Sequence, residues 1–452
     1  MVQPTRAPAG AAAGASELAQ HWPVLAVAFL TSLVTTGLRF ATGPFMSPVA
    51  GDLGLTHAQL SAIVAAAMLL FGLAQPAVGR LADGWGSRPV VAGGIVLLAA
   101  ALLAAAGTRS RLAFAIAYAG VASLALAATG QVALSPVISR WFRRQRGMAM
   151  MFLSAGGMGG IAVLTPVSTA LIGAVGWRTA YAALALFALA VLLPLAWRVL
   201  REAPAVPAAA SEAGAGTAPS PAVPAAREPA PAARAAAPAP WRPALATVPF
   251  WLLACGMFTC GFSMHLMGTN GVPMLEHHGF PPMTASLGIG LIGLVSIGGT
   301  LALGALADRM GRPLFLALIY FVRGLGFLAL AAAGREWELY VTAAIGGLVW
   351  AGSPALTSAL TADLYGARSV GTLFGLLFLI HQVGAAAGAY AGGWAFVAWG
   401  DYTGAFVTAA LLLFAGAAAS WRVAAYPSGP RLTPRAPAAA GGRPSLLPRA
   451  QA

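Results

Sequence analysis

The sequence contains no lysine and very little charge of any kind. Of its 452 residues only 8% are charged, 59% are hydrophobic, and the mean hydropathy is +0.79. An ordinary soluble domain has about 25% charged residues, which help to cover its surface with polar groups. The composition therefore excludes a soluble globular domain and predicts an integral membrane protein.

Cysteine and the common catalytic motifs are also scarce. The two cysteines, Cys255 and Cys260, lie five positions apart in one hydrophobic segment, so they point in different directions and offer neither disulfide nor metal-ligand spacing. The sequence has no nucleotide-binding P-loop, no paired carboxylates and no His/Asp cluster at a membrane face. We therefore expect no metal, no cofactor, no ATP-driven step and no enzymatic activity.

Long hydrophobic runs, in contrast, fill most of the chain. A run of about 20 apolar residues crosses a bilayer as a helix, because the backbone must satisfy its own hydrogen bonds there. The first run is too long for a signal peptide and lacks a cleavage site, so we interpret it as a retained helix. We predict twelve spans, over residues 22–47, 57–79, 89–107, 112–138, 146–172, 178–199, 246–275, 283–306, 313–333, 338–363, 369–393 and 402–421.

The net charge of +14 reflects membrane orientation and not a nucleic-acid partner. All 26 basic residues are arginines, and most fall in short loops between the hydrophobic runs. With both termini in the cytoplasm, twenty of them lie inside and only Arg109, Arg111, Arg178 and Arg335 lie outside, as the positive-inside rule requires. The bias toward alanine and arginine is typical of a GC-rich bacterial genome. We predict a multi-pass protein of the bacterial inner membrane.

A low-complexity segment divides the chain into two halves. Residues 201–242 are almost wholly Ala, Pro, Gly and Ser, and they predict a disordered cytoplasmic linker. We expect a cytoplasmic tail over 1–21, six-helix bundles over 22–200 and 243–421, and a second disordered tail over 422–452, whose arginines can contact anionic lipid.

A repeated motif relates the two halves. "GRLADGWGSRPVV" at 79–91 follows the second predicted span, and "GALADRMGRPLFL" at 304–316 follows the eighth. A polar motif that recurs after the second span of each half indicates duplication of a six-helix unit. Together with the twelve spans, the motif resembles the signature of the major facilitator superfamily, which implies an all-α membrane fold of two pseudo-symmetric six-helix halves.

The motif also predicts a gate. Glycines at 79 and 304 allow helices to pack closely, and Asp83 can pair with arginines or with a helix N-terminus across the cytoplasmic side. The alternative is that these residues only end helices and set the orientation. The gating candidates are Gly79, Asp83 and Arg88, and their counterparts Gly304, Asp308 and Arg312.

Further stretches narrow the resemblance. "SRWFRRQRGMAMMFLSAGGMGG" at 139–160 resembles the W-F-x-x-x-R-G-x-A pattern of the monocarboxylate porters and oxalate/formate antiporters. The arginine that monocarboxylate porters carry on the eighth helix is missing, with Ser296 and Thr300 at the matching positions. The features of drug/proton antiporters are missing as well, because the fourth span has no internal arginine and Pro166 falls outside their proline spacing.

The few ionisable residues inside the spans are the candidate ligands. A buried charge costs at least about 2.5 to 3.5 kcal/mol, so such residues are expected to face a cavity. Arg39 lies past the middle of the first span toward the outside, with outward snorkelling as the alternative, and Arg323 lies near mid-depth, with bracing of neighbouring helices as its alternative. His381 is the first candidate for proton coupling and His265 the second, with Asn270 as a neutral polar contact.

Cations without a membrane-buried carboxylate predict a site for an anion. We therefore expect a secondary transporter of small organic anions of monocarboxylate type, which works as a monomer in the lipid bilayer by alternating access, with proton symport or anion exchange. Efflux of amphipathic drugs or metabolites is the alternative within transporters. A sensor is not favoured, because the linker and tails are too low in complexity to form a folded soluble domain.

Overall fold

The computed structural model describes residues 17–142, 145–201, 242–366 and 370–426, and a few side chains in these ranges, among them those of 300, 301 and 303–310, are not described. The predicted linker lies outside the described residues except for its two end residues, as does most of both predicted tails. The described chain is helical and contains no strand. This agrees with the predicted all-α membrane fold.

The N-terminal half begins with a short helix and then follows the six predicted spans. Its elements are α1 (Glu17–Gln20), α2 (Trp22–Phe40), α3 (Gly43–Leu53), α4 (His57–Trp85), α5 (Ser87–Gly107), α6 (Arg111–Ala115), η1 (Ile116–Ala122), α7 (Ser123–Thr129), α8 (Gln131–Trp141), α9 (Arg146–Phe187), η2 (Ala188–Leu192) and α10 (Leu193–Val199). Those of the C-terminal half are α11 (Arg242–Leu245), α12 (Val248–His277), α13 (Pro282–Met310), α14 (Arg312–Ala331), α15 (Glu336–Leu348), α16 (Gly352–Tyr365), α17 (Val370–Trp399) and α18 (Thr403–Val423).

The number of membrane crossings agrees with the prediction. Eleven segments of the described chain are long and apolar enough to span a membrane. One of them, 148–199, contains two crossings, because Gly176 inside α9 has a φ of 77° and turns the chain there. Glycine takes this left-handed conformation without the steric cost that a Cβ would bring. The described helices therefore cross twelve times.

The first span is longer than predicted and is broken. Pro44 has no N–H and clashes with the preceding turn, so α2 ends at Phe40 and α3 starts again at Gly43. The second piece then runs to Leu53, where Gly54 closes it in the left-handed conformation. Arg39 therefore lies in the last turn of α2, just before the break of the first span. Its predicted position past the middle of the span, toward the outside, stays a prediction.

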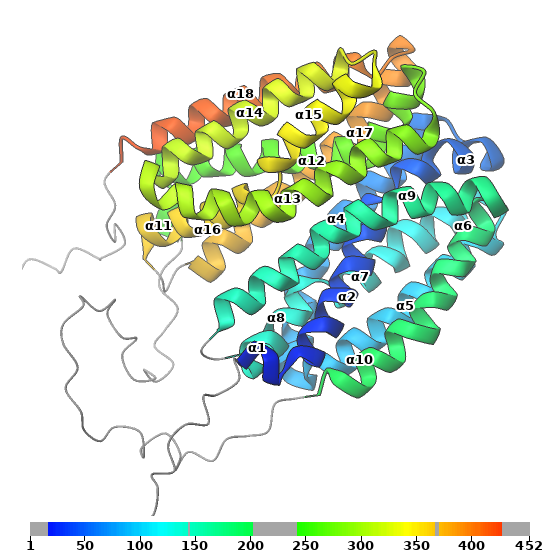
Figure 1. Ribbon diagram of the computed structural model, residues 1–452, viewed down its shortest axis with the longest axis horizontal. Coiled ribbons are helices and arrows are strands. Elements are labelled where there is room, and N and C mark those ends of the chain that lie inside the picture. The colour runs from blue at the N-terminus through cyan, green and yellow to red at the C-terminus, as the bar shows by residue number, and fades with distance from the viewer. Residues whose placement is uncertain (1–16, 143–144, 202–241, 367–369, 427–452) are drawn as a thin grey trace, which may run out of the picture.

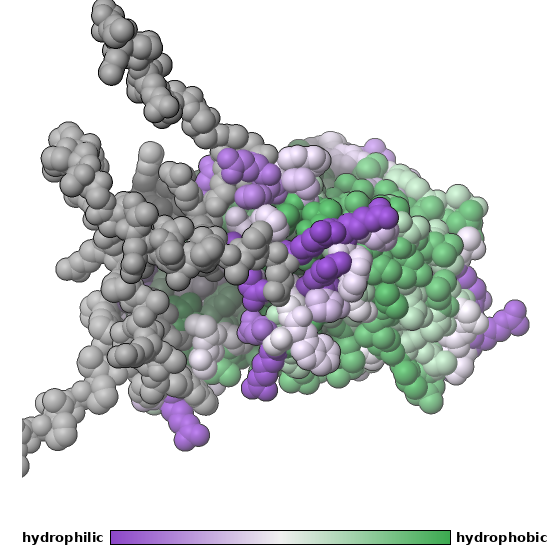
Figure 2. All heavy atoms as spheres, turned by 90° about the horizontal axis from the view of Figure 1, so that it is seen from below, coloured by the Kyte–Doolittle hydropathy of each residue, from purple (hydrophilic) through white to green (hydrophobic). Residues whose placement is uncertain are grey.

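The two halves lie side by side, with α4 and α9 of the first half against α17 and α13 of the second (Figure 1). We call the end of the bundle at which residues 201 and 242 leave the helices the linker end, and the other end, with His57, Gly176 and Gly400, the loop end. Hydrophobic side chains cover much of the surface between the ends, with hydrophilic ones beside the linker end (Figure 2). This is the surface that a lipid bilayer requires.

Close contact between the halves starts at the loop end. Where α4 meets α17, a Cβ at Gly393 would lie 2.5 Å from the carbonyl oxygen of His57, and a Cβ at Gly72 would lie 2.8 Å from Cβ of Gln382. Further toward the linker end, Gly375 of α17 has no atom of the partner half within 4 Å of such a Cβ. These two helices are therefore tightly packed from the loop end to the middle and separate beyond it.

The second pair of helices, α9 and α13, is also tightly packed from the loop end to the middle. The hydroxyls of Thr169 and Ser286 are 2.5 Å apart, and a Cβ at Gly293 would lie 2.7 Å from the carbonyl oxygen of Met158. Further along, Ile297 lies 4.0 Å from a Cβ at Gly159. The described contacts thus close the halves at the loop end, and α4 and α17 separate toward the linker end.

Candidate functional site

Arg39 lies at the break of the first span, between aromatic rings. Its guanidinium carbon is 4.6 Å from the ring centre of Phe71 on α4 and 5.0 Å from that of Phe40. The Nε atom is buried and has no hydrogen-bond partner among the described residues. No carboxylate contacts Arg39 among the described residues, so the contacts of its guanidinium there are the two ring faces.

A small cavity adjoins this arginine. In this conformation it has room for about one water molecule. Its lining residues all belong to the first half and include Arg39, Met68, Phe71, Tyr118 and Ser123. Three of these side chains, Met68, Phe71 and Tyr118, are apolar or aromatic, and Tyr118 shares a hydrogen bond of 2.9 Å with Thr42. The space beside Arg39 therefore offers a cation, hydroxyl groups and an apolar wall, which is the mixture that a small organic anion needs.

The two candidate histidines meet next to Arg39. His265 on α12 is 2% exposed and His381 on α17 is 5% exposed, and their ring centres are 6.3 Å apart. The ring of His265 lies 5.1 Å from that of Phe40, so it sits where the first half touches the second. No ring nitrogen of either histidine makes a hydrogen bond of normal geometry in the described chain, although His381 lies near the thiol of Cys260 and His265 near the backbone of Gly261. Buried polar groups are normally paired, so these four nitrogens mark a place for a ligand, a proton or water.

Gln382 completes this layer and was missed by the sequence analysis. It is fully buried, its side chain packs against Gly72 of the other half, and both amide atoms are unpaired within the described residues. A glutamine inside an apolar helix is neutral, so it gives a weaker signal in the sequence than its neighbour His381. The signal that could have found it is the rarity of polar side chains at mid-span.

Asn270 makes a structural bond inside the C-terminal half. Its amide nitrogen donates to the carbonyl of Ala389 on α17 over 3.0 Å, while its Oδ1 is buried and unpaired in the described part of the chain. The residue thus joins α12 to α17, and its Oδ1 could still accept a hydrogen bond. Its predicted contact with substrate stays a prediction.

Arg323 is placed inside the C-terminal half, not between the halves. It is 1% exposed and its guanidinium donates to the carbonyls of Val349 (2.7 Å) and Trp350 and to the thiol of Cys260 (3.3 Å). The two carbonyls lie where the tenth span breaks between α15 and α16, and they have lost their helical partners there. The geometry favours the bracing alternative, so we leave Arg323 out of the candidate anion site.

Acidic side chains are absent from the middle of the described spans. The carboxylates of the described chain lie near helix ends, as in Asp52, Asp83, Glu276 and Asp363. The central layer of Arg39, His265, His381 and Gln382 therefore has a positive charge that no carboxylate of the described residues balances.

The predicted gate residues of the first half lie at the linker end and do not bridge the halves here. Asp83 is exposed and makes no described ion pair. Arg88 is half-buried and its guanidinium carbon lies 4.1 Å from the ring centre of Trp197, within the same half. A Cβ at Gly79 would meet only Val132 at an ordinary 3.6 Å, so the close packing expected there is not present in this conformation. The gating role stays a prediction.

In the second half, Arg312 binds both oxygens of Asp363, at 2.9 and 2.7 Å. Both contacts come from Nη1, and the ion pair joins the start of α14 to the last turn of α16 within one half. Gly304 and Asp308 fall in the last turns of α13, where the side chains are not described. Ser296, at the position of the arginine found in monocarboxylate porters, is fully buried and donates to the carbonyl of Gly293.

Comparison with known proteins identifies relatives over most of the chain. The model of the Major Facilitator Superfamily matches residues 28–335 and 272–450. An uncharacterized MFS-type transporter of Bacillus subtilis, YcxA, is 26% identical over 407 residues, covering 88% of this chain and 93% of that protein. The oxalate:formate antiporter of Oxalobacter formigenes is 22% identical over 354 residues, covering 77% of this chain and 78% of the antiporter.

Two other matches bear on the alternative function and on the fold. The multidrug resistance protein MdtH of Cronobacter sakazakii is 30% identical over 123 residues, but these cover only 27% of this chain and 31% of MdtH. The crystal structure of a bacterial homologue of the lysosomal transporter Spinster, inward-facing and unoccupied, superposes with a TM-score of 0.70 at 15% identity, over 91% of this chain and 98% of that one. At such identity the likeness shows the fold alone.

Proposed function

Because the chain belongs to the major facilitator superfamily, whose members are carriers and not enzymes, we propose that it is a secondary active transporter of small organic anions. The anion is of monocarboxylate type and binds between the two halves at Arg39. The multi-pass membrane fold and the transporter family are established by the comparisons, whereas the substrate is our proposal.

The observation that carries the proposal is the unpaired charge of Arg39 within the first span. A permanent cation inside a membrane is costly unless it has a function or a partner. Its described contacts are ring faces, which leave the N–H groups of the guanidinium available. A guanidinium and a carboxylate can form two parallel hydrogen bonds, so a carboxylate would balance the charge and occupy these donors.

The likeness to the oxalate:formate antiporter supports the same class of substrate, since that protein's name describes two small carboxylates. The cavity beside Arg39 is small and its walls are largely aromatic and aliphatic. A compact anion with one carboxylate and a short apolar body fits these walls better than a large or highly charged one.

The contacts between the halves support alternating access. The halves pack closely from the loop end to the central layer, and α4 and α17 separate toward the linker end. By the positive-inside rule the linker end faces the cytoplasm, so this conformation opens the site inward. Rocking of the halves about the central layer would open it to the other side.

His381 and His265 are the proposed route for coupling to protons. The ring of His265 lies 5.1 Å from that of Phe40, which Arg39 also contacts, and the ring of His381 lies 6.3 Å from that of His265. A proton on this histidine pair adds positive charge beside the anion, so the anion binds more tightly when the pair is protonated. By linkage, the bound anion in turn favours protonation of the pair. Proton symport follows from this arrangement, and exchange of two anions is the outcome if the histidines do not titrate.

Transport by the purified protein in proteoliposomes tests the proposal. A panel of labelled mono- and dicarboxylates would be offered with and without a pH gradient, with liposomes that lack the protein as the control. We expect saturable uptake of monocarboxylates, increased by the gradient. If labelled cationic drugs accumulate and no carboxylate does, the proposal is wrong and drug efflux takes its place. That alternative is favoured by the partial similarity to MdtH and by the aromatic wall around Arg39.

A further inference from the structure

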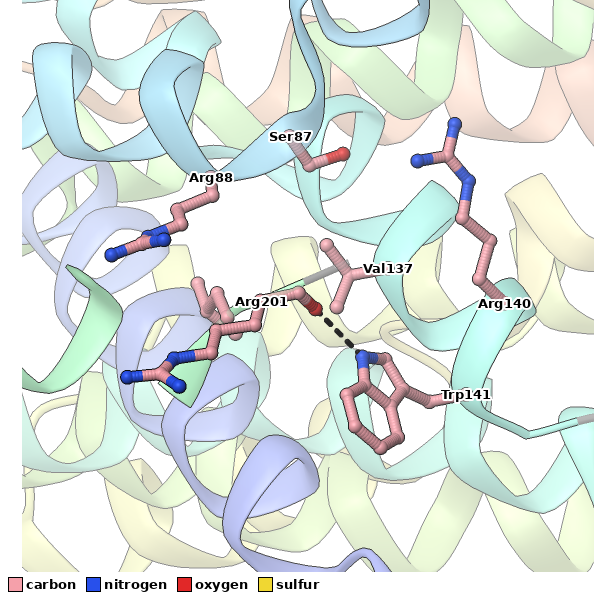
Figure 3. A pocket seen from close by; sticks show the side chains of 7 residues that line it. Ser87, Arg88, Val137, Arg140, Trp141 and Arg201 are labelled. Atoms are coloured by element: carbon pink, nitrogen blue, oxygen red, sulfur yellow. Dashed lines mark hydrogen bonds between the residues drawn. The ribbon is translucent and has the colours of Figure 1, made fainter. Parts of the chain in front are cut away.

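Arg323 carries a buried charge that no carboxylate of the described residues pairs with. Arginines at the linker end, such as Arg140 and Arg201, have exposed side chains that extend in opposite directions, so water can solvate them (Figure 3). Arg323, in contrast, is 1% exposed and lies in the interior of α14, where it contacts α12 and α16. A buried charge is costly unless it is paired, so Arg323 calls for a negative partner.

The thiol of Cys260 is the ionisable group that bonds to Arg323. Nη1 of Arg323 lies 3.3 Å from Sγ of Cys260 on α12, and the hydroxyl of Ser353 on α16 lies 3.1 Å from the same sulfur. The cysteine is fully buried. A guanidinium and a hydroxyl can both donate to a thiolate, and a neighbouring cation favours the thiolate over the thiol. The other acceptors around Arg323 are uncharged, namely the carbonyls of Val349 and Trp350 and the Ser353 hydroxyl.

Two other groups near the sulfur bear on its charge. Tyr320 lies on the same helix as Arg323, but a phenol ordinarily gives up its proton only at about pH 10, against about 8.5 for a thiol. Sδ of Met264, one turn after Cys260, lies 3.7 Å from the thiol sulfur and is the acceptor that a neutral thiol would use. The alternative to a thiolate is therefore a neutral thiol, which would leave the charge of Arg323 without an anion beside it.

Cys260 also lies close to His381 on α17. A Cβ at Gly261, the next residue, would clash with the carbonyl of His381, so the backbones of the two helices touch here. His381 is 5% exposed, and the next titratable group on its other side is His265, whose ring centre is 6.3 Å away. The charge state of Cys260 therefore decides whether His381 meets the full charge of Arg323 or a pair of opposite charges that cancel.

We propose that Cys260 is a thiolate and the counter-ion of Arg323, and that this allows His381 beside it to accept the coupling proton. The proton of the thiol leaves through the imidazole of His381 to water, and the sulfur keeps the electron pair of the S–H bond. Cys260 thus balances charge and is not a substrate ligand. The inference rests on the proposed proton coupling at His381, whereas the ionisation of Cys260 is measurable without any substrate.

The ultraviolet spectrum of the purified full-length protein tests the ionisation. A thiolate has an absorption band that a thiol lacks, and the band is lost on acidification. Cys255→Ala leaves Cys260 as the only cysteine, and Cys260→Ala leaves Cys255, which is half-buried on the same helix. In difference spectra between neutral and acid pH we expect the band in Cys255→Ala, and neither in Cys260→Ala nor in Cys255→Ala/Arg323→Gln. Absence of the band from folded Cys255→Ala overturns the proposal.

The pH dependence of carboxylate binding tests the effect on His381. Cys260→Ser keeps the size and hydrogen bonding of the side chain, but its hydroxyl stays neutral and leaves Arg323 without a counter-ion. The pH above which binding of a labelled monocarboxylate falls should then shift down by about one unit or more, because a proton on His381 meets an unbalanced cation. In Cys260→Ser/Arg323→Gln both charges are absent, so the pH dependence should return to that of the wild type. Cys255→Ser is the matched control and should leave it unchanged.

The two measurements separate this inference from the proposed function. If no variant binds a carboxylate, the proposed function fails, and the spectrum decides whether Cys260 is the counter-ion of Arg323. If Cys260→Ser does not fold, the spectrum of Cys255→Ala decides in the same way. An unchanged pH dependence in folded Cys260→Ser overturns the proposal. So does a shift that persists in Cys260→Ser/Arg323→Gln, because the effect then comes from packing and not from charge.

Discussion

The hydroxyl of Tyr402 and Nδ1 of His57 lie 3.0 Å apart and share a hydrogen bond across the boundary between the two halves. Tyr402 precedes α18 in the second half and His57 starts α4 in the first. Burial, and then the nearby charge of Glu276, raise the pKa of Tyr402, so its hydroxyl keeps its proton at physiological pH. The bond lies at the loop end and belongs to the conformation in which that end is closed.

Removing this bond is expected to loosen the closed loop end. Tyr402→Phe keeps the ring that stacks on Phe396 and removes only the hydroxyl. A neutral hydrogen bond contributes about 1 kcal/mol, so the population open at the loop end should rise about fivefold. This population is measured by placing single cysteines along α4 and α17 and labelling them with a reagent added on the outside. Unchanged labelling would show that the bond does not hold the halves.

A Cβ at Gly393 is expected to shift the same equilibrium. It would lie 2.5 Å from the carbonyl oxygen of His57 and would also clash with Ser61, so the loop end cannot stay closed around it. We expect Gly393→Ala to increase outside labelling more than Tyr402→Phe does. Gly93→Ala is the matched control, because that glycine is exposed on α5 with no atom within 4 Å of an added Cβ. Equal outside labelling in Gly393→Ala and Gly93→Ala would contradict the close contact between Gly393 and the start of α4.

Arg39 is expected to determine anion affinity. In Arg39→Gln the carboxylate loses its charged partner, which costs about 3 to 5 kcal/mol for a buried pair, so affinity should fall by about a hundredfold or more. Arg39→Lys should give an intermediate loss, because an ammonium cannot make the planar two-pronged contact. Binding of a labelled carboxylate measures this, with the thermal midpoint as the control for folding. Full affinity in folded Arg39→Gln would remove the anion from this site.

Arg323 is expected to behave in the opposite way. Its guanidinium satisfies the carbonyls at the break between α15 and α16, and hydrogen bonds to a charged group contribute about 1.5 to 3 kcal/mol each. Arg323→Gln should therefore lower the thermal midpoint and leave the anion affinity of the folded fraction within about twofold. If affinity falls and stability does not, Arg323 belongs to the binding site after all.

His381 is expected to couple transport to the proton gradient. His381→Gln keeps hydrogen bonding but removes titration, so uptake driven by a pH gradient should be lost while exchange at equal pH continues. The same substitution at His265, whose ring lies 6.3 Å away, tells which of the pair takes the proton. Gradient-driven uptake that survives in the double variant would exclude both histidines and leave anion exchange.

Hydrophobicity and the repeat in the sequence were enough to predict the fold. A helix inside a bilayer must satisfy its own backbone, so twelve apolar runs predict twelve crossings wherever they pack. The breaks were not predictable in the same way. The carbonyls freed between α15 and α16 are tolerated only because Arg323, from another helix, donates to them.

The sequence by itself also determined which side chains could carry function, because charged and titratable groups are rare within apolar runs. Only the tertiary structure decided which of them meet. It brings Arg39 beside His265 and His381, adds Gln382, and places Arg323 in a bracing role. It also joins His57 to Tyr402, which are 345 residues apart in the chain. The physical reason is that hydropathy sets the depth of a residue, whereas the direction in which it points is set by the packing of one helix against another.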